Sequence, residues 1–273
     1  MEIIKKAGFI ASVVGIAGVA LVQMLYKGLD PVFLAQQPGW LPWYPLWAYM
    51  GNAAVIIVCG IILYKKQHRQ AAMGLAFGLL ALFVVSHVPF QAMHYPTHPG
   101  MWTNALKSSA LAGGALIIAG LRPATGGPTI NLLRIGGILF AITMVVFGWD
   151  HFIYTDFVAT LVPNWIAGHI FWTYFAGIAL MASGIAIIIN IKAQLAVTLL
   201  GIMLFIWLAI LHIPRAVADP YGLNGNECRS VFEALAFSGI AFILASTPKS
   251  KKGQGFEVDA VKTQAIRHQP AAY

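Results

Sequence analysis

The chain repeats itself at an offset of 125 residues. This shift aligns PGWLPWYPLWAYMGNA in the first copy with PNWIAGHIFWTYFAGI in the second, and VSHVP with ILHIP, without a gap. The identical positions include Trp40 and Trp165, Trp47 and Trp172, Tyr49 and Tyr174, His87 and His212, and Pro89 and Pro214. A long internal repeat predicts one structural unit built twice, and it constrains the architecture before any local pattern is considered.

The composition indicates that lipid surrounds most of the chain. Hydrophobic residues make up 59% of it and charged residues only 10%, whereas a soluble domain carries about 25% charged residues. Runs of about 20 apolar residues cross a bilayer as helices. We therefore predict an all-α membrane protein with eight transmembrane helices, near residues 7–27, 45–64, 70–89, 104–121, 131–149, 168–190, 194–213 and 230–246.

The basic residues predict the orientation of these helices. With the N-terminus inside the cell, 13 of the 17 lysines and arginines fall on the cytoplasmic side, and only Lys27, Lys107, Arg215 and Arg229 fall outside. This asymmetry follows the positive-inside rule. Both termini are then cytoplasmic. Each copy has four spans, so the two four-helix bundles form a parallel repeat.

These boundaries divide the chain into three parts. Residues 1–125 form the first four-helix repeat, residues 126–247 the second, and residues 248–273 a flexible basic cytoplasmic tail. The net charge of +8 does not predict nucleic-acid binding, because the basic residues lie at the ends of apolar runs rather than on one soluble face. The expected partner is the lipid bilayer.

Most histidines and acidic residues lie on the predicted outer side. His87 and His212 lie near the outer end of the third span of each copy, and each is followed two residues later by a proline that ends or kinks the helix. Lipid offers no hydrogen-bond partner at that depth. One interpretation is a histidine bonded to a loop carbonyl, and the other is a pair on the pseudo-twofold axis that binds a ligand or handles protons.

Three further residues complete the catalytic candidates: Asp150, His151 and Glu233. Their counterparts in the first copy are Leu25, Tyr26 and Ser108, so only the second copy carries these charges. An aspartate beside a histidine sets its tautomer, and a carboxylate inside a span is a functional candidate. The structural alternatives are a helix end facing lipid headgroups and an ion pair between Glu233 and Arg229, four residues earlier.

The first copy continues as HVPFQAMHYPTHP, which places His94 and His98 after His87. Three neighbouring imidazoles suit copper, zinc or haem iron, which makes these residues candidate metal ligands. Pro96 and Pro99 predict a loop in this segment.

A second set of residues offers candidate contacts to a cofactor. Tryptophans near the outer interface form either an aromatic belt or a flat pocket for a ring such as a quinone. Arg215 and Asp219 are four residues apart, a spacing that allows them to pair. The candidates are His169, Trp149, Trp172, Arg215 and Asp219.

The second copy resembles a known family. The segments WDHFIYTDFVATLVPNWIAGHIFWTYFAGIALMASGIAI and LFIWLAILHIPRAVADP, within residues 132–246, are similar to DoxX/DoxD-like bacterial membrane proteins. The resemblance implies a four-span bundle, duplicated here. Some relatives are small subunits of a thiosulfate:quinone oxidoreductase, and others are associated with oxidative stress. The family supplies no catalytic motif that transfers residue by residue.

Three functions follow from these patterns. The first is a redox-associated, quinone-linked inner-membrane protein that receives electrons from a redox partner protein. The second is a binding or transport protein for a small solute or a metal ion, and the third is a partner subunit without chemistry of its own. The sequence leaves open whether the protein is an enzyme, and the expected cofactor is a quinone or a transition metal.

Overall fold

The structure is a computed structural model that describes residues 2–26, 32–35, 42–64, 68–121 and 129–247. Within these residues it is mostly helical and contains no strand. The predicted cytoplasmic tail, Trp40 and most of the linker between the copies lie outside the described residues. The long helices are α1 (Glu2–Leu25), α2 (Tyr44–Tyr64), α3 (His68–Leu82), α5 (Thr103–Gly120), α6 (Thr129–Ile153), α8 (His169–Ile189), α9 (Ala193–Trp207) and α11 (Asn226–Ala245).

Seven helical segments of the described chain are long and apolar enough to cross a membrane. Large apolar side chains remain exposed on the outer helices, among them Ile57, Phe171 and Ile178. Exposure of this extent is expected where lipid is the solvent. The protein is therefore a multi-pass membrane protein. The prediction of eight transmembrane helices is confirmed only as far as these seven segments.

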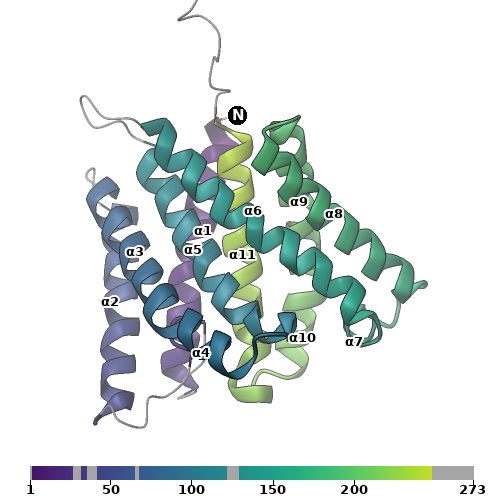
Figure 1. The fold of residues 1–273 in the computed structure, drawn as a ribbon, viewed down its shortest axis with the longest axis horizontal. Coiled ribbons are helices and arrows are strands. Elements are labelled where there is room, and N and C mark those ends of the chain that lie inside the picture. Colours follow the sequence, from purple (N-terminus) through teal and green to yellow (C-terminus); the bar gives the residue numbers. More distant parts are fainter. Residues whose placement is uncertain (1, 27–31, 36–41, 65–67, 122–128, 248–273) are drawn as a thin grey trace, which may run out of the picture.

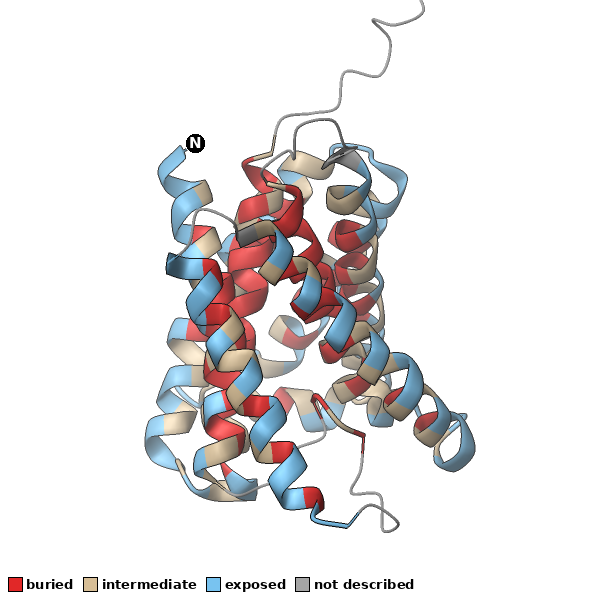
Figure 2. Ribbon diagram, turned by 90° about the vertical axis from the view of Figure 1, so that its left-hand side faces the viewer, coloured by how far each residue is buried: buried red, intermediate tan, exposed pale blue. Residues whose placement is uncertain are grey.

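The predicted span at 104–121 corresponds to α5, which does not count among the seven. Its first half carries Lys107, Ser108 and Ser109, and small residues dominate the rest, so its hydropathy is modest. Every residue from Ser108 to Gly120 is buried. Helices α6, α3 and α11 pack against α5, and its small residues form the packing face. Figure 2 shows that the buried residues gather on the inner helices of the molecule.

The repeat reappears in the helix boundaries. The pairs α2 and α8, and α3 and α9, are each offset by 125 residues at both ends. Each third helix continues through a π-helical turn, η1 (Phe83–His87) or η3 (Leu208–His212), into α4 (Val88–His94) or α10 (Ile213–Ala218). The prolines therefore do not end the helices. A π-helical turn shifts the hydrogen-bond register, so the helix continues although proline has no N–H group to donate.

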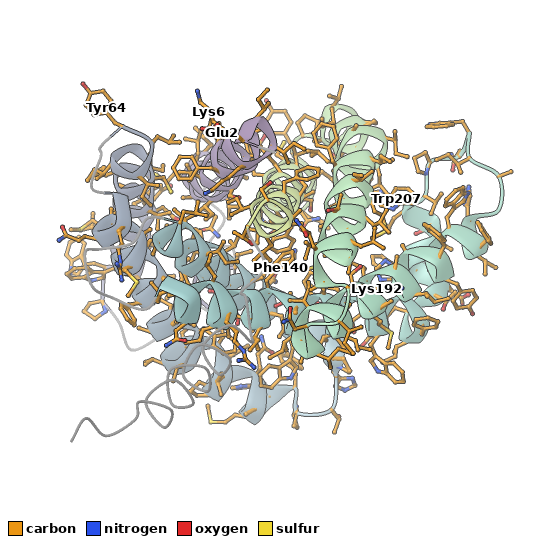
Figure 3. The ribbon with its side chains drawn as sticks, turned by 90° about the horizontal axis from the view of Figure 1, so that it is seen from above. Glu2, Lys6, Tyr64, Phe140, Lys192 and Trp207 are labelled. Carbon is orange, nitrogen blue, oxygen red and sulfur yellow. The ribbon has the colours of Figure 1, made fainter. Side chains whose placement is uncertain are left out.

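The two copies interlock at the centre of the molecule. The first helix of each copy packs along the last helix of the other, so that α1 lies on α11 and α6 lies on α5. Between them, a Cβ at Gly8 would lie 2.8 Å from the carbonyl oxygen of Gly239, and a Cβ at Gly113 would lie 2.6 Å from that of Gly136. Only glycine permits backbones this close. Phe140 fills the core beside them (Figure 3).

The remaining helices lie on opposite sides of this centre (Figure 1). Helices α2 and α3 flank it on one side, and α8 and α9 on the other. The short helices α4, α10 and α7 (Thr155–Leu161) lie together at the end opposite the N-terminus. Most of the residues predicted to carry the function lie near this end.

Candidate functional site

A cavity of about 930 Å³ lies inside the second copy. Its walls come from α6, α7, α8, α9 and α11, and the first copy contributes the segment from His94 to Lys107. Pockets for small molecules have volumes of about 300–1,000 Å³ and are mostly apolar with a few polar groups. The apolar wall here includes Phe147, Leu180, Leu204 and Phe237. The cavity therefore has the size and character of a ligand site.

A buried carboxylate between two cations forms the polar centre of the cavity. Glu233 is only 4% exposed, and its Oε2 lies 2.7 Å from Nζ of Lys107. Its Oε1 lies 3.6 Å from Nε of Arg229, one turn earlier on α11. The pairing with Arg229 that the sequence predicted is therefore present, but the shorter contact joins α11 to α5 of the other copy.

Lys107 is the functional candidate that sequence reasoning missed. The side chain of Lys107 is 15% exposed and lines the cavity. A lysine has three donors, so it can hold Glu233 and still donate to a ligand. One signal was available in the sequence, because Lys107 is a cation within a predicted span on the side where few cations fall.

Asp150 and His151 line the same cavity from the last turns of α6. The Nδ1 atom of His151 donates to the carbonyl oxygen of Phe147 at 2.7 Å, which fixes the ring and directs Nε2 away from that carbonyl. Oδ1 of Asp150 is buried and has no hydrogen-bond partner among the described residues. A buried carboxylate oxygen without a partner is costly, and a donor on a ligand would satisfy it.

The two repeated histidines have different surroundings. His212 lines the cavity. His87 is fully buried, and its Nε2 lies 3.1 Å from the carbonyl oxygen of Val32. Next to it the N–H of Ala35 donates to Ser86 at 3.0 Å. Val32 and Phe33 are buried in the core at this position of the first copy. His87 thus fits the interpretation of a histidine bonded to a loop carbonyl, and only His212 belongs to the candidate site.

The structure does not bring the three proposed metal ligands together. His94 and His98 line the rim of the cavity, whereas His87 lies in the core of the first copy. His94 stacks on Phe90 at a ring distance of 4.4 Å, and its Nδ1 donates to the carbonyl oxygen of Phe90. Within the described part of the chain, no group of three His, Cys, Asp or Glu residues is placed to hold a metal ion.

Only some of the residues predicted to contact a cofactor line the cavity. Trp172 lines the cavity, but His169 and Trp149 do not, and Trp149 is 52% exposed on the outer surface. The predicted pair of Arg215 and Asp219 is wrong. Arg215 instead makes two hydrogen bonds with Glu227, of 2.7 and 2.9 Å.

The sequence-based pairing failed because a short loop reverses the chain. Asp219 accepts a hydrogen bond from the N–H of Gly222 at 2.9 Å, in the turn between α10 and α11. This turn brings Glu227 at the start of α11 to Arg215. A two-pronged contact between guanidinium and carboxylate is stronger than the single contact that helical spacing offers.

The fold defines a helical multi-pass membrane protein, and the cavity is its candidate site. Comparisons of the chain with models of protein families, with curated proteins and with solved structures found no match. The resemblance to DoxX/DoxD-like proteins therefore stays a prediction.

Proposed function

We propose that this protein binds a small amphipathic molecule with a flat polar ring, of the quinone class, in the cavity of the second copy. The observation that carries the proposal is the ion-paired Glu233, held by Lys107 of the first copy inside an otherwise apolar cavity. An apolar pocket with few convergent polar groups is the usual form of such a site.

Each polar group has a role in this proposal. Lys107 and His212 donate hydrogen bonds to the carbonyl oxygens of a quinone ring. Asp150 accepts a hydrogen bond from the hydroxyl group of the reduced ring. The aromatic side chains of Phe147, Trp172 and Phe237 stack against the ring or meet its edge.

The proposal extends to a redox association and to the location of the protein. Reduction of a quinone consumes protons together with electrons, and Asp150, His151 and His212 offer proton-handling groups in the cavity. A redox partner protein supplies the electrons. The distribution of basic residues supports cytoplasmic termini, and the resemblance to DoxX/DoxD-like proteins supports a bacterial inner membrane. A DoxX/DoxD-like membership agrees with this function.

Calorimetric titration of the purified protein in lipid nanodiscs tests the proposal. The ligands are the tail-less dimethoxy-methyl-benzoquinone and its hydroquinone. We expect saturable binding of both, and Asp150→Leu, which introduces the residue of the first copy, is expected to weaken the hydroquinone by about tenfold, the equivalent of one hydrogen bond to a charged group.

The matched control is Asp156→Leu, since Asp156 is an exposed acid of α7 outside the cavity lining. It is expected to bind both rings as the unmodified protein does. Absence of saturable binding, or equal weakening by both substitutions, contradicts the proposal and favours a partner subunit without chemistry of its own.

A further inference from the structure

A second hollow runs along the outer face of the second copy, between α8 and α9. Its volume is about 790 Å³. Its walls are almost entirely apolar, and several of its residues are strongly exposed, including Ile178, Leu195 and Leu199. Lys192, which precedes α9, is the charged residue of its lining, and small side chains at Ala179 and Ala182 keep the hollow open. We call this hollow the α8/α9 groove.

The α8/α9 groove shares a wall with the cavity. Trp172, Met203 and Trp207 line both. The rings of Trp172 and Trp207 meet edge to face, with centroids 6.4 Å apart. Trp207 extends from α9 toward α8 (Figure 3), and Nε1 of Trp172 donates to the carbonyl oxygen of Ala167 at 3.2 Å. Three side chains therefore separate the cavity, which holds the charged groups, from a lipid-facing groove.

The dimensions and chemistry of the two hollows complement each other. The cavity holds the charged groups Lys107, Glu233 and Asp150, whereas the groove offers almost only hydrocarbon. From Trp172 to Ala186 the α8 side of the groove is about 21 Å long at the helical rise of 1.5 Å per residue. A single amphiphile matches both surfaces, because its polar head suits the cavity and its long tail suits the groove.

We propose that the ligand carries a hydrocarbon tail, which crosses the wall formed by Trp172, Met203 and Trp207 after the two indole rings have turned out of their edge-to-face contact. The tail then lies in the α8/α9 groove while the polar head occupies the cavity. This inference rests on the proposed function and adds the tail to the ligand class. It also gives the route of entry, because a tailed molecule dissolved in the bilayer reaches the cavity sideways. Met203, with an unbranched side chain, adapts to the passage.

Photo-crosslinking in nanodiscs tests the position of the tail. The probe is the dimethoxy-methyl-benzoquinone ring with a decyl tail that ends in a diazirine, and adducts are mapped by mass spectrometry of peptides. We expect adducts on α8 and α9 that are lost when an excess of the tail-less ring is present. If the probe instead binds non-specifically, as a surrounding lipid does, the tail-less ring does not displace its adducts, and this result contradicts the proposal.

Two variants form a matched pair. Ala179→Phe fills the groove without lining the cavity, and it is expected to abolish the displaceable adducts on α8 and α9. Ala54→Phe is the equivalent change in the first copy, on the exposed face of α2, and is expected to leave them intact.

The outcomes separate the two proposals. If the tail-less ring binds but the displaceable adducts map elsewhere, the inference about the tail is overturned and the cavity stays the head site. If the tail-less ring neither binds nor displaces the probe, the proposed function itself fails. The competition experiment uses the unmodified protein, so a folding defect in Ala179→Phe does not remove the test.

Discussion

At the scale of single residues, equivalent positions of the two copies have taken different roles. His87 is sealed in the core against the carbonyl oxygen of Val32, whereas His212 lines the cavity. Ser108 is buried and uncharged, whereas its counterpart Glu233 carries the ion pair with Lys107. The sequence predicted the difference between Ser108 and Glu233 but showed the same residue at His87 and His212, and the contacts around each residue determine its role.

The ion pair between Lys107 and Glu233 is expected to stabilise the fold as a unit. Glu233→Gln leaves the cations of Lys107 and Arg229 in a buried site with one fewer counter-charge, which is expected to cost about 3–5 kcal/mol of unfolding free energy. Lys107→Met combined with Glu233→Gln removes both charges of the closest pair and should recover part of that loss. Reversible denaturation in mixed micelles measures the unfolding free energy of Glu233→Gln, of Lys107→Met and of the double variant.

The two substitutions should be non-additive, because the residues share one interaction. Additive losses in this cycle would mean that the 2.7 Å contact contributes nothing to stability. Arg215→Met with Glu227→Gln provides a comparison, because this pair has good geometry but its arginine side chain is 37% exposed. A more exposed pair is expected to give a smaller coupling energy.

At the scale of helices, glycines decide which neighbours approach closely. Gly113 and Gly136 bring α5 and α6 into contact, and Gly8 and Gly239 do the same for α1 and α11. Gly74 and Gly78 on α3 have no atom within 4 Å of the position of an added Cβ. The sequence shows small residues in all these helices, but it does not indicate which of them face a partner.

Gly113→Ala is expected to destabilise the protein by about 1–3 kcal/mol, the usual cost of forcing extra volume into a packed interface. The added methyl group would lie 2.6 Å from the carbonyl oxygen of Gly136, so the two helices must separate. Gly78→Ala, the control, is expected to be neutral or slightly stabilising because alanine favours the helix. Thermal unfolding in detergent compares them, and equal behaviour of the two variants would contradict the close approach.

Helix boundaries were the part of the structure that the sequence predicted well. Apolar runs gave the positions of the long helices, since burial in lipid requires such runs. The continuation past Pro89 and Pro214 was not predicted, because a proline ordinarily ends a helix and the π-helical turns have no clear sequence pattern.

At the scale of the whole molecule, interlocking of the copies builds the site. Lys107 belongs to the first copy and Glu233 to the second, so neither copy alone contains the polar centre. The cavity lies in the second copy, whereas the first copy has Val32 and Phe33 packed into its core at the corresponding place. The duplication thus provides two similar frames, and one of them encloses the ligand site.

Orientation of the whole molecule is tested by cysteine labelling in intact bacterial cells. In a Cys228→Ser background, where the remaining Cys59 is buried, a membrane-impermeant maleimide is expected to label Asp156→Cys but not Lys192→Cys. Asp156 lies at the end of the molecule opposite the N-terminus, and Lys192 lies in the turn between α8 and α9. The reverse pattern would place the N-terminus outside the cell.

The sequence by itself determined the membrane class, the duplicated plan and the helix positions, because these depend on local hydropathy and on a regular offset along the chain. Only the tertiary structure decided which candidates meet: it placed Lys107, Asp150, His151, His212 and Glu233 around one cavity and left His87, His169 and Trp149 outside it. The physical reason is that helix packing sets which faces meet. Close glycine contacts across the two copies fix that packing, and spacing along one helix does not reveal them.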